Sequence, residues 1–232
     1  MSLSVNEWPK GWGAFLLLSP VPSYRTWLKQ SESPVFQYRN VAVLILELSG
    51  LAAFYYLPSD ISYVSHWHWF LQAYLAIVPF VVLVDALGQS CRMIYGLFGF
   101  NLPHIHNGFL NSKKLSGFWN RWNSWFADFL QETCFRAFIR RPQTGMATAF
   151  AMSGIFHEYL VNLPLYWVFR QNLFGTMMLY FLIQAVGILL QRNFLGRGFW
   201  INWIWTWLVV ILPAPLVLNR GTLLIFHLGF FG

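Results

Sequence analysis

Long apolar runs alternate with short polar segments along most of the chain. Runs near bilayer length, for which a helix takes about 20 apolar residues, occur at 41–57, 69–87, 145–169, 173–191 and 199–218. Two shorter runs, 93–103 and 222–231, are ambiguous, because runs of that length are often interfacial or part of a tilted helix. The pattern predicts an all-α, multi-pass transmembrane helical bundle. No repeat or linker interrupts it, so we expect residues 1–232 to form a single domain.

Composition supports an integral membrane protein. Of 232 residues, 57% are hydrophobic and only 10% are charged, too few polar side chains to cover a soluble protein of this size. A net charge of +7 could indicate nucleic-acid binding, but the bases flank apolar runs, as positive-inside sorting requires. We therefore expect membrane lipids as surroundings, no nucleic-acid partner, a cytoplasmic N-terminus and no cleavable signal peptide. Cys91 and Cys134 lack a CxxC neighbour and are expected to be free thiols.

The basic segment between the second and third long runs has helical periodicity. Its apolar residues are spaced three or four apart, with polar residues opposite them: Phe118, Trp122, Trp125, Phe126, Phe129 and Leu130. The spacing predicts an amphipathic helix over 118–139 that lies at the membrane interface. A surface anchor without further function explains this segment equally well.

The third long run carries a polar strip. His157 stands near its centre, and the neighbouring Glu158 is the only formal charge between Arg141 and Arg170. An ionised acid at that depth costs about 2.5–3.5 kcal/mol, so ionisable groups there usually mark proton, substrate or catalytic sites. Ser153 and His157 share a helix face, which makes Ser153 or Glu158 the candidate to hold one ring nitrogen. The alternative is a core histidine bonded to a helix carbonyl.

Two segments resemble one family. Residues 118–123 read FWNRWN and are similar to the FWxRW(N/H) segment of membrane-bound O-acyltransferases. Residues 153–159 read SGIFHEY and resemble the intramembrane histidine motif of that family, including the HEY form of its sterol, diacylglycerol and wax-synthase-like branches. The resemblance covers mainly residues 111–165. The motifs stand in the family's order, with the basic amphipathic segment between them.

The resemblance implies acyl transfer from acyl-CoA, as co-substrate, to a hydroxyl of a lipid or alcohol acceptor, without a bound cofactor. It implies that His157 is the general base and that Asn123 orients the donor or bonds the developing oxyanion. Glu158, Ser153 and Trp122 would orient the base or line the tunnel. The cytoplasmic bases suited to the CoA phosphates are Arg121, Arg140 and Arg141. A similar FWxRW(H) segment occurs in the polysaccharide-acetylating branch, which leaves acetyl transfer open.

Two other functions remain open. His66 with His68, and His104 with His106, form HxH pairs that suit a metal only in extended chain, and we expect no metal site. A transporter or proton pathway could use His157, Glu158 and the acids Glu47 and Asp85, which also lie inside apolar runs. Acyl transfer offers Glu47 no obvious role.

Overall fold

The computed structural model describes residues 38–56, 68–97, 102–196 and 198–225, and every regular element in them is helical. The prediction of an all-α chain is therefore confirmed for these residues. In chain order the elements are α3 (Tyr38–Tyr56), α5 (Trp69–Leu75), α6 (Ile77–Leu97), η3 (Phe109–Asn111), α7 (Leu115–Trp122), α8 (Ser124–Leu130), η4 (Gln131–Phe135), η5 (Arg136–Phe138), α9 (Pro142–His157), η6 (Glu158–Asn162), α10 (Leu163–Phe169), α11 (Thr176–Phe194), α12 (Phe199–Ile211), η7 (Ala214–Leu216) and α13 (Arg220–Ile225).

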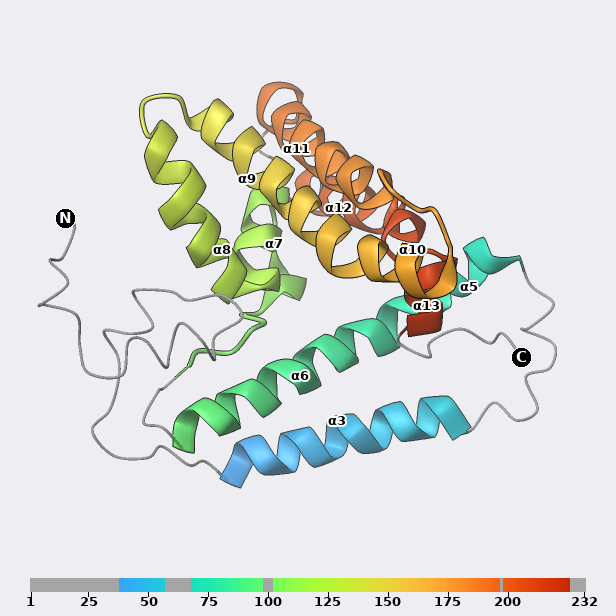
Figure 1. The fold of residues 1–232 in the computed structure, drawn as a ribbon. Helices are drawn as coiled ribbons and strands as arrows, with labels where there is room; N and C mark the ends of the chain where they lie inside the picture. Colours follow the sequence, from blue (N-terminus) through green and yellow to red (C-terminus); the bar gives the residue numbers. More distant parts are fainter. Residues whose placement is uncertain (1–37, 57–67, 98–101, 197, 226–232) are drawn as a thin grey trace, which may run out of the picture.

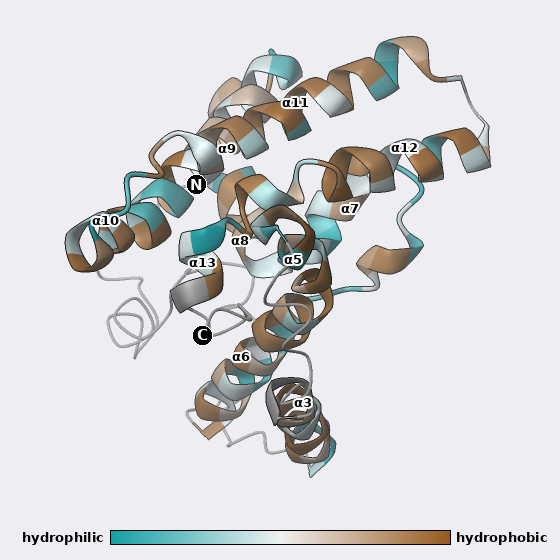
Figure 2. Cartoon of the chain, turned by 90° about the vertical axis from the view of Figure 1, so that its right-hand side faces the viewer, coloured by the Kyte–Doolittle hydropathy of each residue, from teal (hydrophilic) through white to brown (hydrophobic). Residues whose placement is uncertain are grey.

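Three helical segments of the described chain are long and apolar enough to cross a membrane. They are Ile77–Leu97, Thr176–Phe194 and Phe199–Leu216. Large apolar side chains are also exposed, among them Trp200 at 70% and Leu212 at 68%. The ribbons of α11 and α12 are coloured mostly as hydrophobic (Figure 2). A surface of this kind is typical of a protein surrounded by lipid. These features indicate a membrane protein.

The expected helix at 69–87 divides in two. The chain turns at Ala76 between α5 and α6, because Pro79 has no N–H for the carbonyl of Leu75 and its ring crowds that carbonyl. α6 then continues to Leu97 and takes in the first part of the short run 93–103. Of the other short run, only residues up to 225 lie inside the described part, in α13.

The helices form a main body and a separate pair (Figure 1). In the main body α9 packs antiparallel against α11, and Phe150, Tyr180, Phe181 and Ala185 form a buried cluster between them. α7 and α12 complete this body. α3 lies beside α6 in both views, away from the α9–α11 core (Figures 1 and 2). α6 therefore separates α3 from the rest.

Buried amides fix α7 against α11 and α12. Gln191 accepts a hydrogen bond from the Leu115 N–H at 2.9 Å and donates to the Asn202 carbonyl at 3.0 Å. Gln184 accepts from the Trp119 indole at 3.3 Å and donates to the Val209 carbonyl at 2.8 Å. Polar side chains commonly join helices in this way in membrane proteins. The first helix of the FWNRWN segment is thus held inside the body.

The amphipathic segment is not one interfacial helix. It breaks at Asn123, where φ is −129° and ψ is 86°, so that α7 ends and α8 begins. Its apolar side chains also contact protein: Phe118 and Trp125 are 3% and 8% exposed. The prediction of a single helix over 118–139 is therefore wrong. The reason is that Phe118 packs on Phe109 and Trp207 from other elements, which the local periodicity does not reveal.

Candidate functional site

A cavity of about 860 Å³ lies between the helices of the main body and α6. Residues from α6, α7, α8, η4, α9, α11, α12 and η7 line it, and most of them are aromatic or aliphatic. Four of the residues predicted from the sequence belong to this lining: Trp122, Asn123, Ser153 and His157. The structure thus brings both motifs to one cavity, although they lie on different helices.

His157 is held in a defined tautomer. Its Nδ1 lies 2.7 Å from the Ser153 carbonyl oxygen, one helical turn earlier. A carbonyl oxygen can only accept, so Nδ1 must carry the proton and Nε2 of the neutral ring keeps its lone pair. Among the described residues no hydrogen-bond partner of Nε2 is found. The backbone of Ser153, and neither its hydroxyl nor Glu158, therefore orients this ring.

Aromatic rings fix the position of the imidazole. The Phe181 ring of α11 lies 4.6 Å from the His157 ring, centroid to centroid, and the Phe126 ring of α8 lies 6.4 Å away and nearly perpendicular to it. Phe126 also packs edge-on against Phe156 at 5.6 Å. The imidazole therefore sits where α8, α9 and α11 meet, inside a largely apolar wall.

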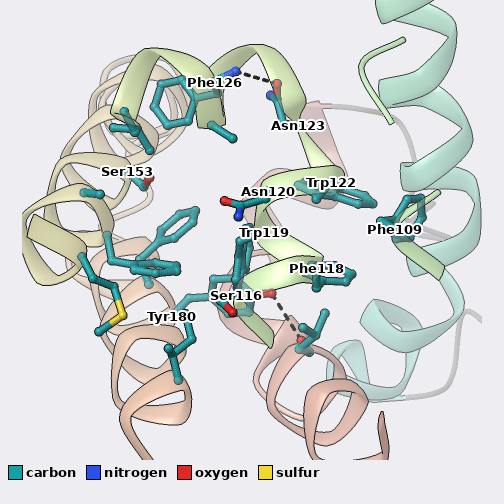
Figure 3. Close-up of a pocket in the computed structure, with 18 of the residues that line it drawn as sticks. Phe109, Ser116, Phe118, Trp119, Asn120, Trp122, Asn123, Phe126, Ser153 and Tyr180 are labelled. Carbon is teal, nitrogen blue, oxygen red and sulfur yellow. Dashed lines mark hydrogen bonds between the residues drawn. The ribbon is translucent and has the colours of Figure 1, made fainter. Parts of the chain in front are cut away.

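Asn123 occupies the break between α7 and α8. Its Oδ1 accepts a hydrogen bond from the Phe126 N–H at 3.1 Å, which caps α8 (Figure 3). Because Oδ1 is used in the cap, the amide Nδ2 is the group left to donate into the cavity. The cap also connects two parts of the site, since Phe126 is the residue whose ring lies against His157.

α7 contributes a further amide that the sequence analysis did not single out. Asn120 points from α7 toward the side of the cavity where Ser153 lies (Figure 3). The ring of Trp122, on the same helix, packs on the His106 ring with 4.4 Å between their centroids, and the Trp122 backbone carbonyl accepts a hydrogen bond from His106. The FWNRWN motif itself was a signal for Asn120, because Asn120 stands inside it.

The cavity has a basic end at the surface. Arg136 and Arg192 line it there, and both are exposed, whereas Arg121, Arg140 and Arg141 are not among its lining residues. Arg136 belongs to the basic segment between the second and third long runs, but it was not among the bases predicted to bind the CoA phosphates. Arg192 could not be found from sequence, because only the antiparallel packing of α9 and α11 brings the end of α11 beside the start of α9.

The basic end and the imidazole lie on different levels of the cavity. Phe181, which contacts His157, and Arg192 are both in α11, eleven residues apart. At 1.5 Å per residue their levels differ by about 16 Å. The lining farther from the basic end is apolar and comes from α6, α12, η7 and the residues directly after η7: Phe80, Val84, Val210, Ala214, Val217 and Leu218.

Glu158 lies outside the cavity lining and caps another helix. Its Oε1 accepts hydrogen bonds from the Gly175 N–H at 2.9 Å and the Met178 N–H at 3.0 Å, at the start of α11. Its Oε2 accepts from the Asn162 amide at 2.8 Å. A carboxylate at a helix N-terminus is stabilised by the unpaired N–H groups and the helix dipole. This arrangement compensates the charge that the sequence analysis treated as functional.

A π-helical turn, η6, follows His157 immediately, between α9 and α10. Pro164, at the start of α10, has no N–H to continue the regular pattern. A second π-helical turn, η4, directly follows α8, and both line the cavity. Single π-helical turns are frequent at functional sites. The predicted run 145–169 is thus one helical rod whose pitch changes at the candidate base.

The histidines of the HxH pairs that lie in the described residues contact other protein groups. His68 accepts from the Phe70 N–H at the start of α5, and His104 contacts the Arg92 guanidinium at 3.1 Å. His66 lies outside the described residues. Within those residues there is no group of three or more His, Cys, Asp or Glu side chains that could hold a metal ion. Cys91 and Cys134 are both free thiols.

Comparison with known proteins adds no relative. No family model matches this chain, and no curated protein matches it at a significant level.

Proposed function

We propose that this chain is a multi-pass membrane O-acyltransferase that moves an acyl group from acyl-CoA to a hydroxyl of a lipid or alcohol. The observation that carries the proposal is a histidine with a free Nε2 on the wall of an apolar cavity that also contains the Asn123 amide. Acyl transfer needs a base and a fixed donor for the oxyanion, and no covalent nucleophile. The resemblance of residues 118–123 and 153–159 to the membrane-bound O-acyltransferases supports the same reaction.

The reaction follows from the groups present. His157 Nε2 takes the proton of the acceptor hydroxyl as the hydroxyl oxygen attacks the thioester carbonyl. The tetrahedral oxyanion accepts a hydrogen bond from the Asn123 Nδ2–H. Collapse of this intermediate breaks the C–S bond, leaves the new C–O ester bond, and returns the proton from the imidazolium to the departing thiolate. The Ser153 carbonyl stabilises the imidazolium through Nδ1–H while it holds the proton.

The basic end gives the acyl donor a direction. Arg136 and Arg192 can pair with the phosphates of CoA, while the pantetheine arm extends inward over the level difference of about 16 Å toward His157. This orientation places the basic end at the cytoplasmic face, where CoA is available. In this proposal Arg136 and Arg192 replace Arg121, Arg140 and Arg141 as the phosphate contacts.

The volume and lining of the cavity favour a fatty acyl donor over acetyl-CoA. A volume of about 860 Å³ far exceeds the space that an acetyl group needs. Its apolar end could bury an alkyl chain, and each buried methylene contributes about 0.8 kcal/mol. A wax-synthase-like reaction therefore fits this cavity better than acetylation of a polysaccharide.

The test is an assay of the purified chain in lipid nanodiscs with labelled acyl-CoAs of several lengths and a long-chain alcohol. His157→Ala should lower the rate by about 10²- to 10⁴-fold, the usual contribution of a general base. The matched control is His68→Asn, which changes a histidine outside the cavity and keeps a residue suited to capping α5. A folded His157→Ala variant that keeps the parental rate would refute the proposal. Proton flux in liposomes that survives His157→Ala without acyl-CoA would favour a transporter.

A further inference from the structure

Polar side chains lie along the sides of α3 and α6 that face each other, away from the cavity. Asp85, Gln89 and Arg92 are four and three residues apart along α6 and share one helix face. Asn40 and Glu47 are seven residues apart on α3 and also share a face. Both helices are otherwise strongly apolar, so this match indicates a specific polar contact between them.

The contacts along this interface form two groups. At one level the side chains of Glu47 and Asp85 are hydrogen bonded to each other. About two turns away, Arg92 donates to the Gln89 oxygen at 2.7 Å, to the Asn40 oxygen at 3.4 Å and to the Leu102 carbonyl at 2.9 Å. The guanidinium therefore bonds to neutral acceptors.

The carboxyl pair requires a proton. Ionised carboxylates carry only acceptors, so a hydrogen bond between Glu47 and Asp85 exists only when one of them is protonated. Oε2 of Glu47 is buried, and no amide, hydroxyl or guanidinium group of the described residues donates a hydrogen bond to it. Two charges here would therefore repel each other without such a donor to stabilise them. We propose that Glu47 and Asp85 share one proton and form a protonation-controlled clamp that holds α3 on α6.

The other charged and titratable groups near the pair do not replace this proton. Arg92 on α6 and Arg39 on α3 are the cations, and Tyr74 of α5 donates its hydroxyl to the Leu212 carbonyl. His104, which follows α6, has a pKa below its usual value because of burial first and the Arg92 charge second. The Asp85 charge opposes this lowering only in part, so His104 stays neutral near neutral pH.

Helix α6 connects the clamp with the cavity, because it contacts α3 and also lines the cavity. α3 lies against α6 in both views, and the other side of α6 supplies Phe80 and Val84 to the cavity wall (Figures 1 and 2). Val84 directly precedes Asp85 in the chain. Loss of the shared proton would release α3 and leave this part of the wall supported from one side only. This inference does not depend on acyl transfer.

Infrared spectroscopy of the full chain in nanodiscs tests the proton itself. At neutral pH the parent should show the C=O stretch of a protonated carboxyl. The Glu47→Gln/Asp85→Asn double variant should lose that band, whereas Asp128→Asn, a matched acid elsewhere, should keep it. Glu158 should not contribute, because its two oxygens accept three N–H hydrogen bonds as a carboxylate. Absence of the band from the parent, or its persistence in the double variant, would overturn the proposal.

Spin-label distances test the clamp. Labels at Leu46 on α3 and Leu87 on α6, both exposed, leave the interface intact after Cys91 and Cys134 are replaced by serine. The parent should lose its narrow distance distribution as pH rises. The double variant should keep that distribution at every pH, because the two amides still hydrogen bond and cannot ionise. A parent distribution that does not change with pH refutes the clamp. If the double variant does not fold, Asp85→Asn alone takes its place. The clamp is then also refuted if the distance distribution of this single variant broadens with rising pH as much as that of the parent.

Discussion

Replacing Glu158 separates a structural role from a catalytic one. Glu158→Ala removes the acceptor for the N–H groups of Gly175 and Met178 and for the Asn162 amide. Gly175 is exposed and can find another partner, but the Met178 N–H is partly buried and would be left unpaired. An unpaired buried donor costs about 1–3 kcal/mol. Loss of the charge at the helix N-terminus adds about 0.3–1 kcal/mol.

We therefore expect Glu158→Ala to lower the free energy of unfolding by about 1.3–4 kcal/mol. Glu158→Gln keeps an oxygen for the N–H groups of α11 and should lose about 1 kcal/mol. The assay is unfolding in mixed micelles by titration with a denaturing detergent. Tyr159→Ala is the control, because Tyr159 is the next residue and is 65% exposed. The reasoning is refuted if Glu158→Ala unfolds like the parent, or if Glu158→Gln loses as much as Glu158→Ala.

Three further predictions concern the packing, the cap and the pH dependence. Gly154→Ala should lower the free energy of unfolding by about 1 kcal/mol or more, because the added Cβ would lie 3.1 Å from a backbone atom of α11. Gly50→Ala is the control: its Cβ would meet open space, so the substitution should stabilise α3. Unfolding titrations compare the two variants. Asn123→Asp should keep the hydrogen bond to the Phe126 N–H, and with it the parental stability, but it loses the Nδ2–H donor, so its rate of acyl transfer should fall. Asn123→Ala should lose both the stability and the rate. Equal rates for the parent and the aspartate variant would contradict the proposed oxyanion role. Because burial lowers the folded-state pKa of His104, the unfolded chain binds more protons than the folded chain as pH falls through the ordinary histidine value of 6.5. Stability should therefore fall as pH drops through that value, and His104→Asn should weaken this dependence in unfolding curves recorded from pH 8 to pH 5.

Apolar runs predicted the helices well where length and composition decide the outcome. The runs 173–191 and 199–218 correspond to α11 and to α12 with its short continuation, and the described part of 41–57, up to Tyr56, lies in α3. The divided helix at Ala76 was visible in principle, because Pro79 was in the sequence, but a proline in a first turn is also compatible with an unbroken helix start. Periodicity alone could not show the break at Asn123, because the spacing of apolar residues continues through it.

The candidate site could be predicted in part. Both motif residues, His157 and Asn123, line one cavity, as their resemblance to a single family implied. The basic residues at its mouth could not be selected, because they depend on which helix ends meet. Sequence places Arg192 far from Arg136, and only the antiparallel course of α9 and α11 brings both to one end.

The adjacent residues His157 and Glu158 show why residue spacing predicted the cavity position of one of them and not the surroundings of the other. Neighbouring helical residues point about 100° apart, so the two side chains must enter different surroundings. His157 turns to the cavity, where its Nδ1 uses a carbonyl of its own helix, a partner that periodicity could suggest. Glu158 turns to the start of α11, where its partners Gly175 and Met178 lie seventeen and twenty residues later in the chain. Glu158 therefore caps the helix whose Phe181 packs on the candidate base, and the proposed proton transfer does not use it.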